Sequence, residues 1–222
     1  TDGVDAGKSL GSSANDNIFL GRYAGCNVSS ADNNILIGCH AGKQTNANSN
    51  VFIGLSAGCL NTGSYNMAFG YGANIRNGSG QFNIVLGTDA GRCLGSTDAN
   101  IIIGAAAANN AQISGSNNVV IGCRAAHDLQ GASDIVAIGR QSLCKVTSGT
   151  GNVALGSFAG CCITTGTCNV AIGHQAMSAG TPTGSFNFSA GYYSSHALTS
   201  GGGNIAIGEN ALRCEQVGQC NI

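Results

Sequence analysis

The sequence predicts an all-β protein, a parallel β-solenoid (β-roll) of about twelve coils with 16–18 residues in each. Three observations lead to this fold class. A glycine recurs every 16, 17 or 18 residues, short alternating apolar segments precede it, and the 222-residue chain holds 36 Gly but only 9% charged residues. Self-similarity at a fixed period is the signature of repeat architectures, in which each unit buries its apolar face against its neighbours.

Each repeat begins with a short apolar strand that ends at a glycine, as in Asn169-Val170-Ala171-Ile172-Gly173. We number the asparagine as position 1 and the glycine as position 5. Positions 2 and 4 are apolar with few exceptions, which indicates a strand, and the glycine indicates a turn at positive φ, where a Cβ is unfavourable. The predicted turn glycines are Gly21, Gly38, Gly54, Gly70, Gly87, Gly104, Gly122, Gly139, Gly156, Gly173, Gly191 and Gly208.

The asparagine at position 1 predicts a ladder of side-chain amides along the stack of coils. Residues at one position of successive coils lie directly above one another, so that each amide can bond to those of the neighbouring coils. The predicted ladder contains Asn17, Asn34, Asn50, Asn66, Asn83, Asn100, Asn118, Asn152, Asn169, Asn187 and Asn204, and Ile135 replaces asparagine in one repeat.

Position 3 predicts an interface between copies of the chain. Successive strand residues point to opposite sides, so if positions 2 and 4 fill the coil, position 3 faces outward. Eleven of the twelve position-3 residues are nevertheless apolar, which predicts a stripe that a partner covers. The large members, Phe19, Leu36, Phe52, Val85, Ile102 and Val120, are the predicted oligomer interface, and the small residues after residue 136 predict closer packing there.

Composition and charge exclude several classes of partner. Nine basic and ten acidic residues give a net charge of −1 with no basic stripe, so no nucleic-acid partner is expected. The apolar segments are too short for membrane insertion. The register predicts a single repeat array over residues 1–222 that starts and ends within a repeat, as a slice of a longer fibre.

No catalytic residue, metal site or cofactor is predicted, so the chain is not expected to be an enzyme. The four histidines fall in different repeats, and no two carboxylates share a register in adjacent coils. Among the eleven cysteines, Cys162 with Cys168 and Cys214 with Cys220 are candidate disulfides, and the alternative is that they are thiols. Tyr192 and Tyr193 are an exposed aromatic pair that could stack on a sugar.

The motifs Asn169-Val170-Ala171-Ile172-Gly173 and Asn204-Ile205-Ala206-Ile207-Gly208 resemble the head repeats of trimeric autotransporter adhesins. The stretch from Asn50 to Gly70 is similar to repeat arrays in tail fibres of marine bacteriophages such as cyanophages. These resemblances imply a homotrimeric rod, located in the virion tail fibre, that attaches to a glycan or protein receptor on the host surface.

Two alternatives stay open at this point. The same array could be a bacterial adhesin head on the extracellular cell surface. An ice-binding solenoid is a third hypothesis, but it requires a regular threonine array, and threonine here falls only in the irregular closing turns.

Overall fold

The computed structural model describes residues 2–109, 112–180 and 182–222, and it contains twelve strands of three residues. Two compact units divide the chain, Thr1–Ser114 and Gly115–Ile222. The first holds β1 (Ile18–Leu20), β2 (Ile35–Ile37), β3 (Val51–Ile53), β4 (Met67–Phe69), β5 (Ile84–Leu86) and β6 (Ile101–Ile103). The second holds β7 (Val119–Ile121), β8 (Val136–Ile138), β9 (Val153–Leu155), β10 (Val170–Ile172), β11 (Phe188–Ala190) and β12 (Ile205–Ile207).

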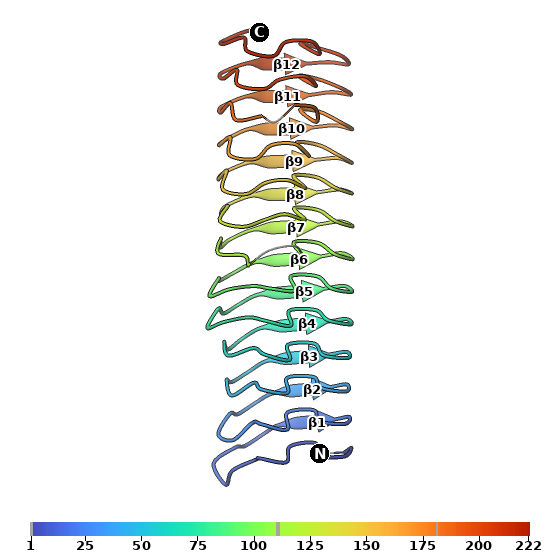
Figure 1. Ribbon diagram of the computed structural model, residues 1–222, viewed down its shortest axis with the longest axis vertical. Coiled ribbons are helices and arrows are strands. Elements are labelled where there is room, and N and C mark those ends of the chain that lie inside the picture. The colour runs from blue at the N-terminus through green and yellow to red at the C-terminus, as the bar shows by residue number, and fades with distance from the viewer. Residues whose placement is uncertain (1, 110–111, 181) are drawn as a thin grey trace. The chain divides into compact units, whose positions relative to one another are not determined.

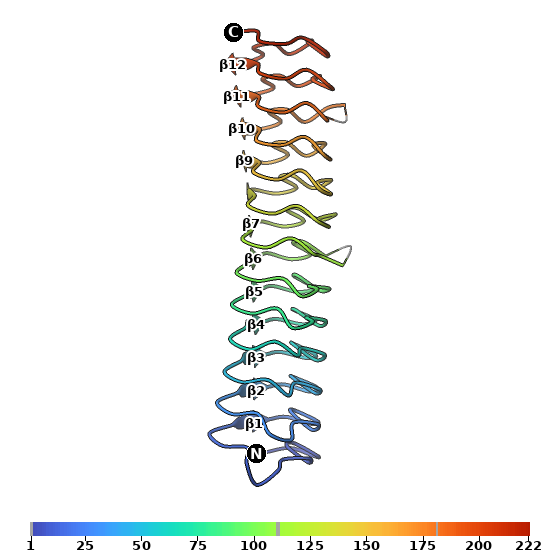
Figure 2. The same cartoon turned by 90° about the vertical axis from the view of Figure 1, so that its left-hand side faces the viewer.

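Within each unit the strands pair in parallel with their sequence neighbours, and equivalent repeat positions face each other. Ile18 pairs with Ile35 in the first unit, and Val153 pairs with Val170 in the second. The strands of a unit therefore stack one above the next with their arrows in the same direction (Figure 1). Within each unit they line one side of the coils, and the connecting loops extend away from them (Figure 2). The predicted fold class, a parallel β-solenoid, is confirmed.

The glycine at position 5 turns the chain out of each strand. All twelve of these glycines have φ between +115° and +142°, a region that side chains with a Cβ rarely adopt. Space is a second restriction, because a Cβ on Gly156 would lie 2.7 Å from the carbonyl oxygen of Gly173 in the next coil. Both the backbone conformation and the stacking therefore require glycine here.

The asparagines at position 1 form a hydrogen-bonded ladder inside the coils. The backbone N–H and the side-chain Nδ2 of Asn187 both donate to Oδ1 of Asn169, each at 3.0 Å. The Asn187 amide also donates to the carbonyl oxygen of Gly201 at 2.9 Å. At the interruption, the backbone N–H of Ile135 still donates to Oδ1 of Asn118. The buried amides thus join each strand to the closing turn of the next coil.

The predicted orientation of the strands is wrong. The central strand residue, position 3, points into its own coil, and positions 2 and 4 point outward. Phe19, Leu36, Phe52, Val85, Ile102 and Val120 are all between 0 and 1% exposed in the single chain, so they form its core. They are not an intermolecular interface.

The residue at position 9 lies in the turn that faces the strand. Its size explains why the side chain at position 3 can fill the coil interior. The glycines of this position leave room for a large residue: a Cβ on Gly42 would lie 2.7 Å from Leu36, and a Cβ on Gly25 would lie 2.8 Å from the Phe19 ring. Small position-3 residues are instead mostly matched by larger position-9 residues. The pairs are Ala137 with Leu143, Ala171 with Met177 and Ala206 with Leu212.

This matching also corrects the prediction of closer packing between chains after residue 136. The change from large to small side chains at position 3 is taken up inside the coil. Ser189 and Ser195 show the same pairing with polar residues, because their hydroxyls form a 2.7 Å hydrogen bond. The coil interior stays filled because a smaller side chain at position 3 is mostly matched by a larger one at position 9.

Candidate functional site

Positions 2 and 4 form an uncharged apolar surface on each unit, which we call the strand face. Every residue at these positions is a large apolar one except Ala190. Most are half-buried by the coils above and below, and several are more exposed. Those exposed by 37–71% are Ile18, Leu20, Met67, Ile138, Ile172, Phe188, Ile205 and Ile207.

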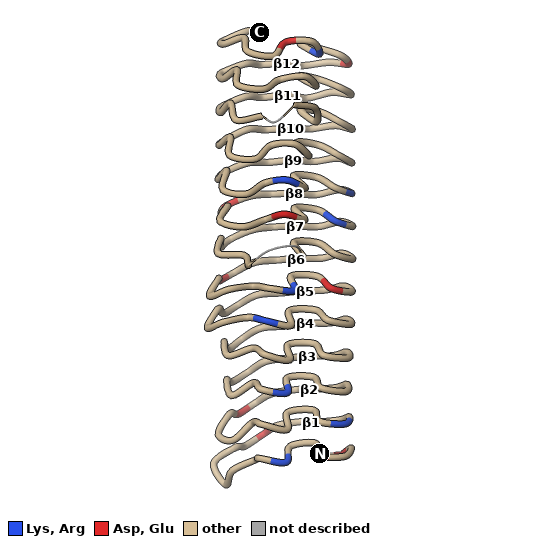
Figure 3. Tube along the Cα trace, in the orientation of Figure 1, with Lys and Arg blue, Asp and Glu red and all other residues tan. Residues whose placement is uncertain are grey.

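The strand face repeats in every strand of each unit. With strands about 4.8 Å apart and a rise of about 3.3 Å per residue, six three-residue strands cover about 300 Å². That area matches the largest apolar patch of a typical soluble monomer. Lysine, arginine, aspartate and glutamate all lie outside the strands (Figure 3).

A second surface lies in the second unit, where five successive coils bring rings and cations together. We call it the corner cluster. Its members are Arg140, Phe158, His174, Tyr192, Tyr193, His196 and Arg213.

The rings of the corner cluster contact one another within and between coils. His174 stacks on Tyr192 with ring centroids 5.5 Å apart, and Tyr192 meets Tyr193 edge-on at 4.3 Å. His196 lies 4.8 Å from Tyr193. The pairing of Tyr192 with Tyr193 expected from the sequence is thus part of a larger group that the coil register assembles.

Two guanidinium groups complete this cluster. Arg140 lies 4.5 Å from the ring centroid of Phe158, and Arg213 lies 4.9 Å from that of Tyr193, both within cation–π range. Partial burial lowers the pKa of His196, and the positive charge of Arg213 lowers it further. The lowered pKa favours the neutral form of His196, and acidification adds its charge.

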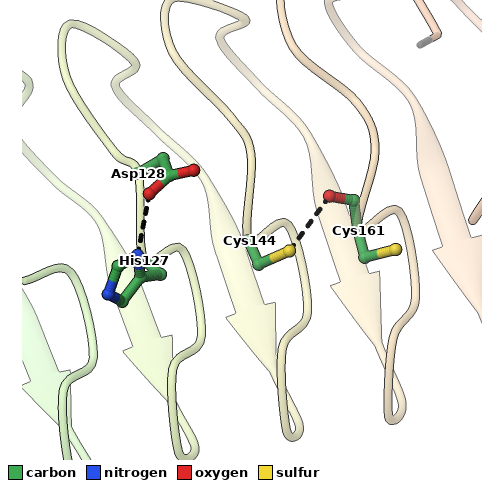
Figure 4. A network of polar contacts seen from close by, with 4 residues as sticks. All are labelled: His127, Asp128, Cys144 and Cys161. Carbon is green, nitrogen blue, oxygen red and sulfur yellow. Dashed lines mark hydrogen bonds and ion pairs between the residues drawn. The ribbon is translucent and has the colours of Figure 1, made fainter. Parts of the chain in front are cut away.

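A histidine, an aspartate and two cysteines lie in three adjacent coils of the second unit (Figure 4). Nδ1 of His127 lies 2.7 Å from Oδ1 of Asp128. The Cys144 thiol donates to the carbonyl oxygen of Cys161 at 3.2 Å, on the side away from His127. The Cys144 thiol therefore donates its hydrogen bond to a carbonyl oxygen. An activated nucleophile would instead donate its hydrogen bond to a general base.

The candidate disulfides are not formed, because all eleven cysteines, including Cys162, Cys168, Cys214 and Cys220, are free thiols. The thiols of the first pair have different neighbours. Sγ of Cys162 lies 3.6 Å from Sγ of Cys161, whereas Sγ of Cys168 packs against Gly151 in the preceding coil. Hydrogen bonding to Cys161, together with the charge of Lys145, lowers the pKa of Cys162 to about 6.

Two kinds of feature are absent among the described residues. No three His, Cys, Asp or Glu side chains gather as metal ligands. The same residues include no helix with the length and apolar character needed to cross a membrane. The chain matches no protein-family model, no curated protein and no solved structure.

Sequence reasoning missed the outward direction of positions 2 and 4 and most of the corner cluster. The cluster could have been found from the repeat register, which aligns His174 with Tyr192 in neighbouring coils and Phe158 with Tyr193 two coils apart. The orientation had a weaker signal, the inverse relation between side-chain sizes at positions 3 and 9.

Proposed function

We propose that the chain is a non-enzymatic structural and attachment segment of a viral tail fibre. In this proposal it forms part of a rigid homotrimeric rod that presents receptor-binding surfaces to a host cell. The observation that carries the proposal is the uncharged strand face on a stack of similar coils. The resemblance of the repeats to those of tail fibres supports the viral location.

A second copy of the chain is the partner that best fits the strand face. Each coil adds two outward apolar side chains at a rise of about 4.8 Å. A partner with the same rise can meet every coil in the same way, and a copy of the chain has that rise. A closed cyclic arrangement covers the face of every copy, and the resemblance to trimeric adhesins favours three.

Light scattering coupled to size-exclusion chromatography tests the assembly. We expect the purified chain to have three times the mass of its 22.0 kDa monomer. The double substitution Ile138→Lys and Ile172→Lys places charges at outward positions and should yield folded monomers. Ser200→Lys with Gln219→Lys adds the same charge at exposed positions off the strand face and should leave the trimer intact.

A chain that stays monomeric at micromolar concentration would contradict this assembly. Equal dissociation by both double variants would show that charge alone, rather than the strand face, controls association. The viral location is tested separately by immunogold labelling, which should mark phage tail fibres. Labelling of the bacterial surface would favour the adhesin.

A further inference from the structure

We propose that the corner cluster binds an acidic polysaccharide. Sugar rings lie against its exposed aromatic side chains, and the carboxylates of uronic-acid units accept hydrogen bonds from Arg140 and Arg213. The proposal rests on the attachment function above and names the chemical class of the receptor.

The aromatic part of the cluster joins more rings than the other ring groups among the described residues. Tyr192 is 46% exposed, and its neighbour His174 is exposed as well. The other ring contacts among the described residues are the pairs Tyr23–His40, beside Arg22, and Tyr65–Phe82. Extended aromatic surfaces with polar edges suit sugars, which combine apolar C–H faces with hydroxyl groups.

The two arginines provide the preference for acidic sugars. Within the described residues the structure shows ion pairs only for Lys8 with Asp5 and for His127 with Asp128, so both guanidinium groups lack an acidic partner. Stacking on a ring occupies the flat face of a guanidinium and leaves its N–H edge for a carboxylate. The hydrogen bond with Tyr193 raises the pKa of the Tyr192 hydroxyl, and the negative charge of Glu209 raises it further.

The spacing of the arginines fits a chain of several sugars. Arg140 follows β8 and Arg213 follows β12, four coils apart, which corresponds to roughly 19 Å at about 4.8 Å per coil. Single-stranded nucleic acid also combines stacking with anionic groups, but it carries a phosphate at every unit and needs a denser row of cations. Two arginines four coils apart favour the polysaccharide.

Isothermal titration calorimetry with three probes tests the class of ligand. The chain is titrated with an alginate hexamer, with the neutral cellohexaose and with single-stranded oligo(dT). We expect alginate to bind most tightly. Tighter binding of oligo(dT), equal binding of cellohexaose, or no binding of alginate would overturn the proposal.

Matched variants test the site. Tyr192→Ala with Tyr193→Ala should weaken alginate binding by about tenfold or more, the loss expected for removing stacking contacts. Both alanines are compatible with the fold, because Ala105 and Ala106 occupy the same repeat positions. Tyr71→Ala, at an equivalent but isolated position, should have no effect.

A second pair of double variants tests how much the arginine charges contribute to alginate binding. Arg140→Gln with Arg213→Gln should weaken alginate binding by about tenfold or more, and raised salt should reduce this difference. Arg76→Gln with Arg124→Gln removes the same charge elsewhere, and an equal loss there would overturn the site. Light scattering on the same samples separates the two proposals, because an intact trimer without alginate binding contradicts only this inference.

Discussion

At the scale of single residues, the glycine at position 5 is required by two separate conditions. Its backbone lies at φ above +100°, and the next coil fills the space that a Cβ would need. Gly208 separates the two conditions. It shares the φ region, at +115°, but nothing lies within 4 Å of its Cβ position.

Gly156→Val should therefore lower stability more than Gly208→Val. Both variants pay a conformational cost of about 1–3 kcal/mol, and only Gly156→Val also meets the Gly173 carbonyl. Thermal unfolding followed by circular dichroism gives the comparison. Equal losses would show that the backbone conformation alone requires glycine.

The neighbours of Cys162 change the chemistry of its thiol. With a pKa of about 6, its thiol is largely ionised at pH 7. Cys161→Ala removes the hydrogen bond that lowers this pKa and should slow alkylation of Cys162 several-fold at pH 7. The slowing stays moderate because a thiolate of higher pKa is intrinsically more nucleophilic.

Alkylation rates of the individual cysteines, measured by mass spectrometry between pH 5 and 9, test this prediction. Cys59 provides the control, because burial raises its pKa and it should react slowly at pH 7. Identical rates for Cys162 in both proteins would contradict the proposed hydrogen bond.

At the scale of the coil, the core is a contact between one strand residue and one turn residue. Phe52 lies over Gly58, whose added Cβ would contact the phenylalanine ring. In another coil Ala137 is matched with Leu143, which adopts the same left-handed backbone conformation as Gly58. The two arrangements fill the same space from opposite sides.

Phe52→Ala should cost about 3–5 kcal/mol by leaving a cavity, and Gly58→Leu alone should destabilise by overpacking. The double variant should recover much of the loss, because it recreates the pairing of Ala137 with Leu143. A double-mutant cycle from denaturant unfolding measures the coupling. Additive losses would mean that the two positions do not share one space.

At the scale of the whole molecule, stability comes from contacts between successive coils, and the proposed association would add the covering of the strand face. If copies of the chain cover that face, the folded state is linked to association, and the melting temperature rises with protein concentration. Ile138→Lys with Ile172→Lys should abolish this dependence. A melting temperature that is independent of concentration in the parent chain would contradict the linkage.

The sequence by itself determined the repeat, the strand at positions 2–4, the turn glycine and the asparagine that joins neighbouring coils. These features depend on local backbone conformation and on a period, and both can be read along one chain. The ladder could be inferred because residues one period apart must stack in a parallel solenoid.

Only the tertiary structure decided which side of the strand is the core. All three residues of most strands are apolar, so alternation carries no information about inside and outside. The choice depends on the turn that faces the strand, where Gly42 admits Leu36 and Leu143 fills the space beside Ala137. The corner cluster depends on the same kind of information, because contacts such as that of Arg213 with Tyr193 join different coils and exist only after they stack.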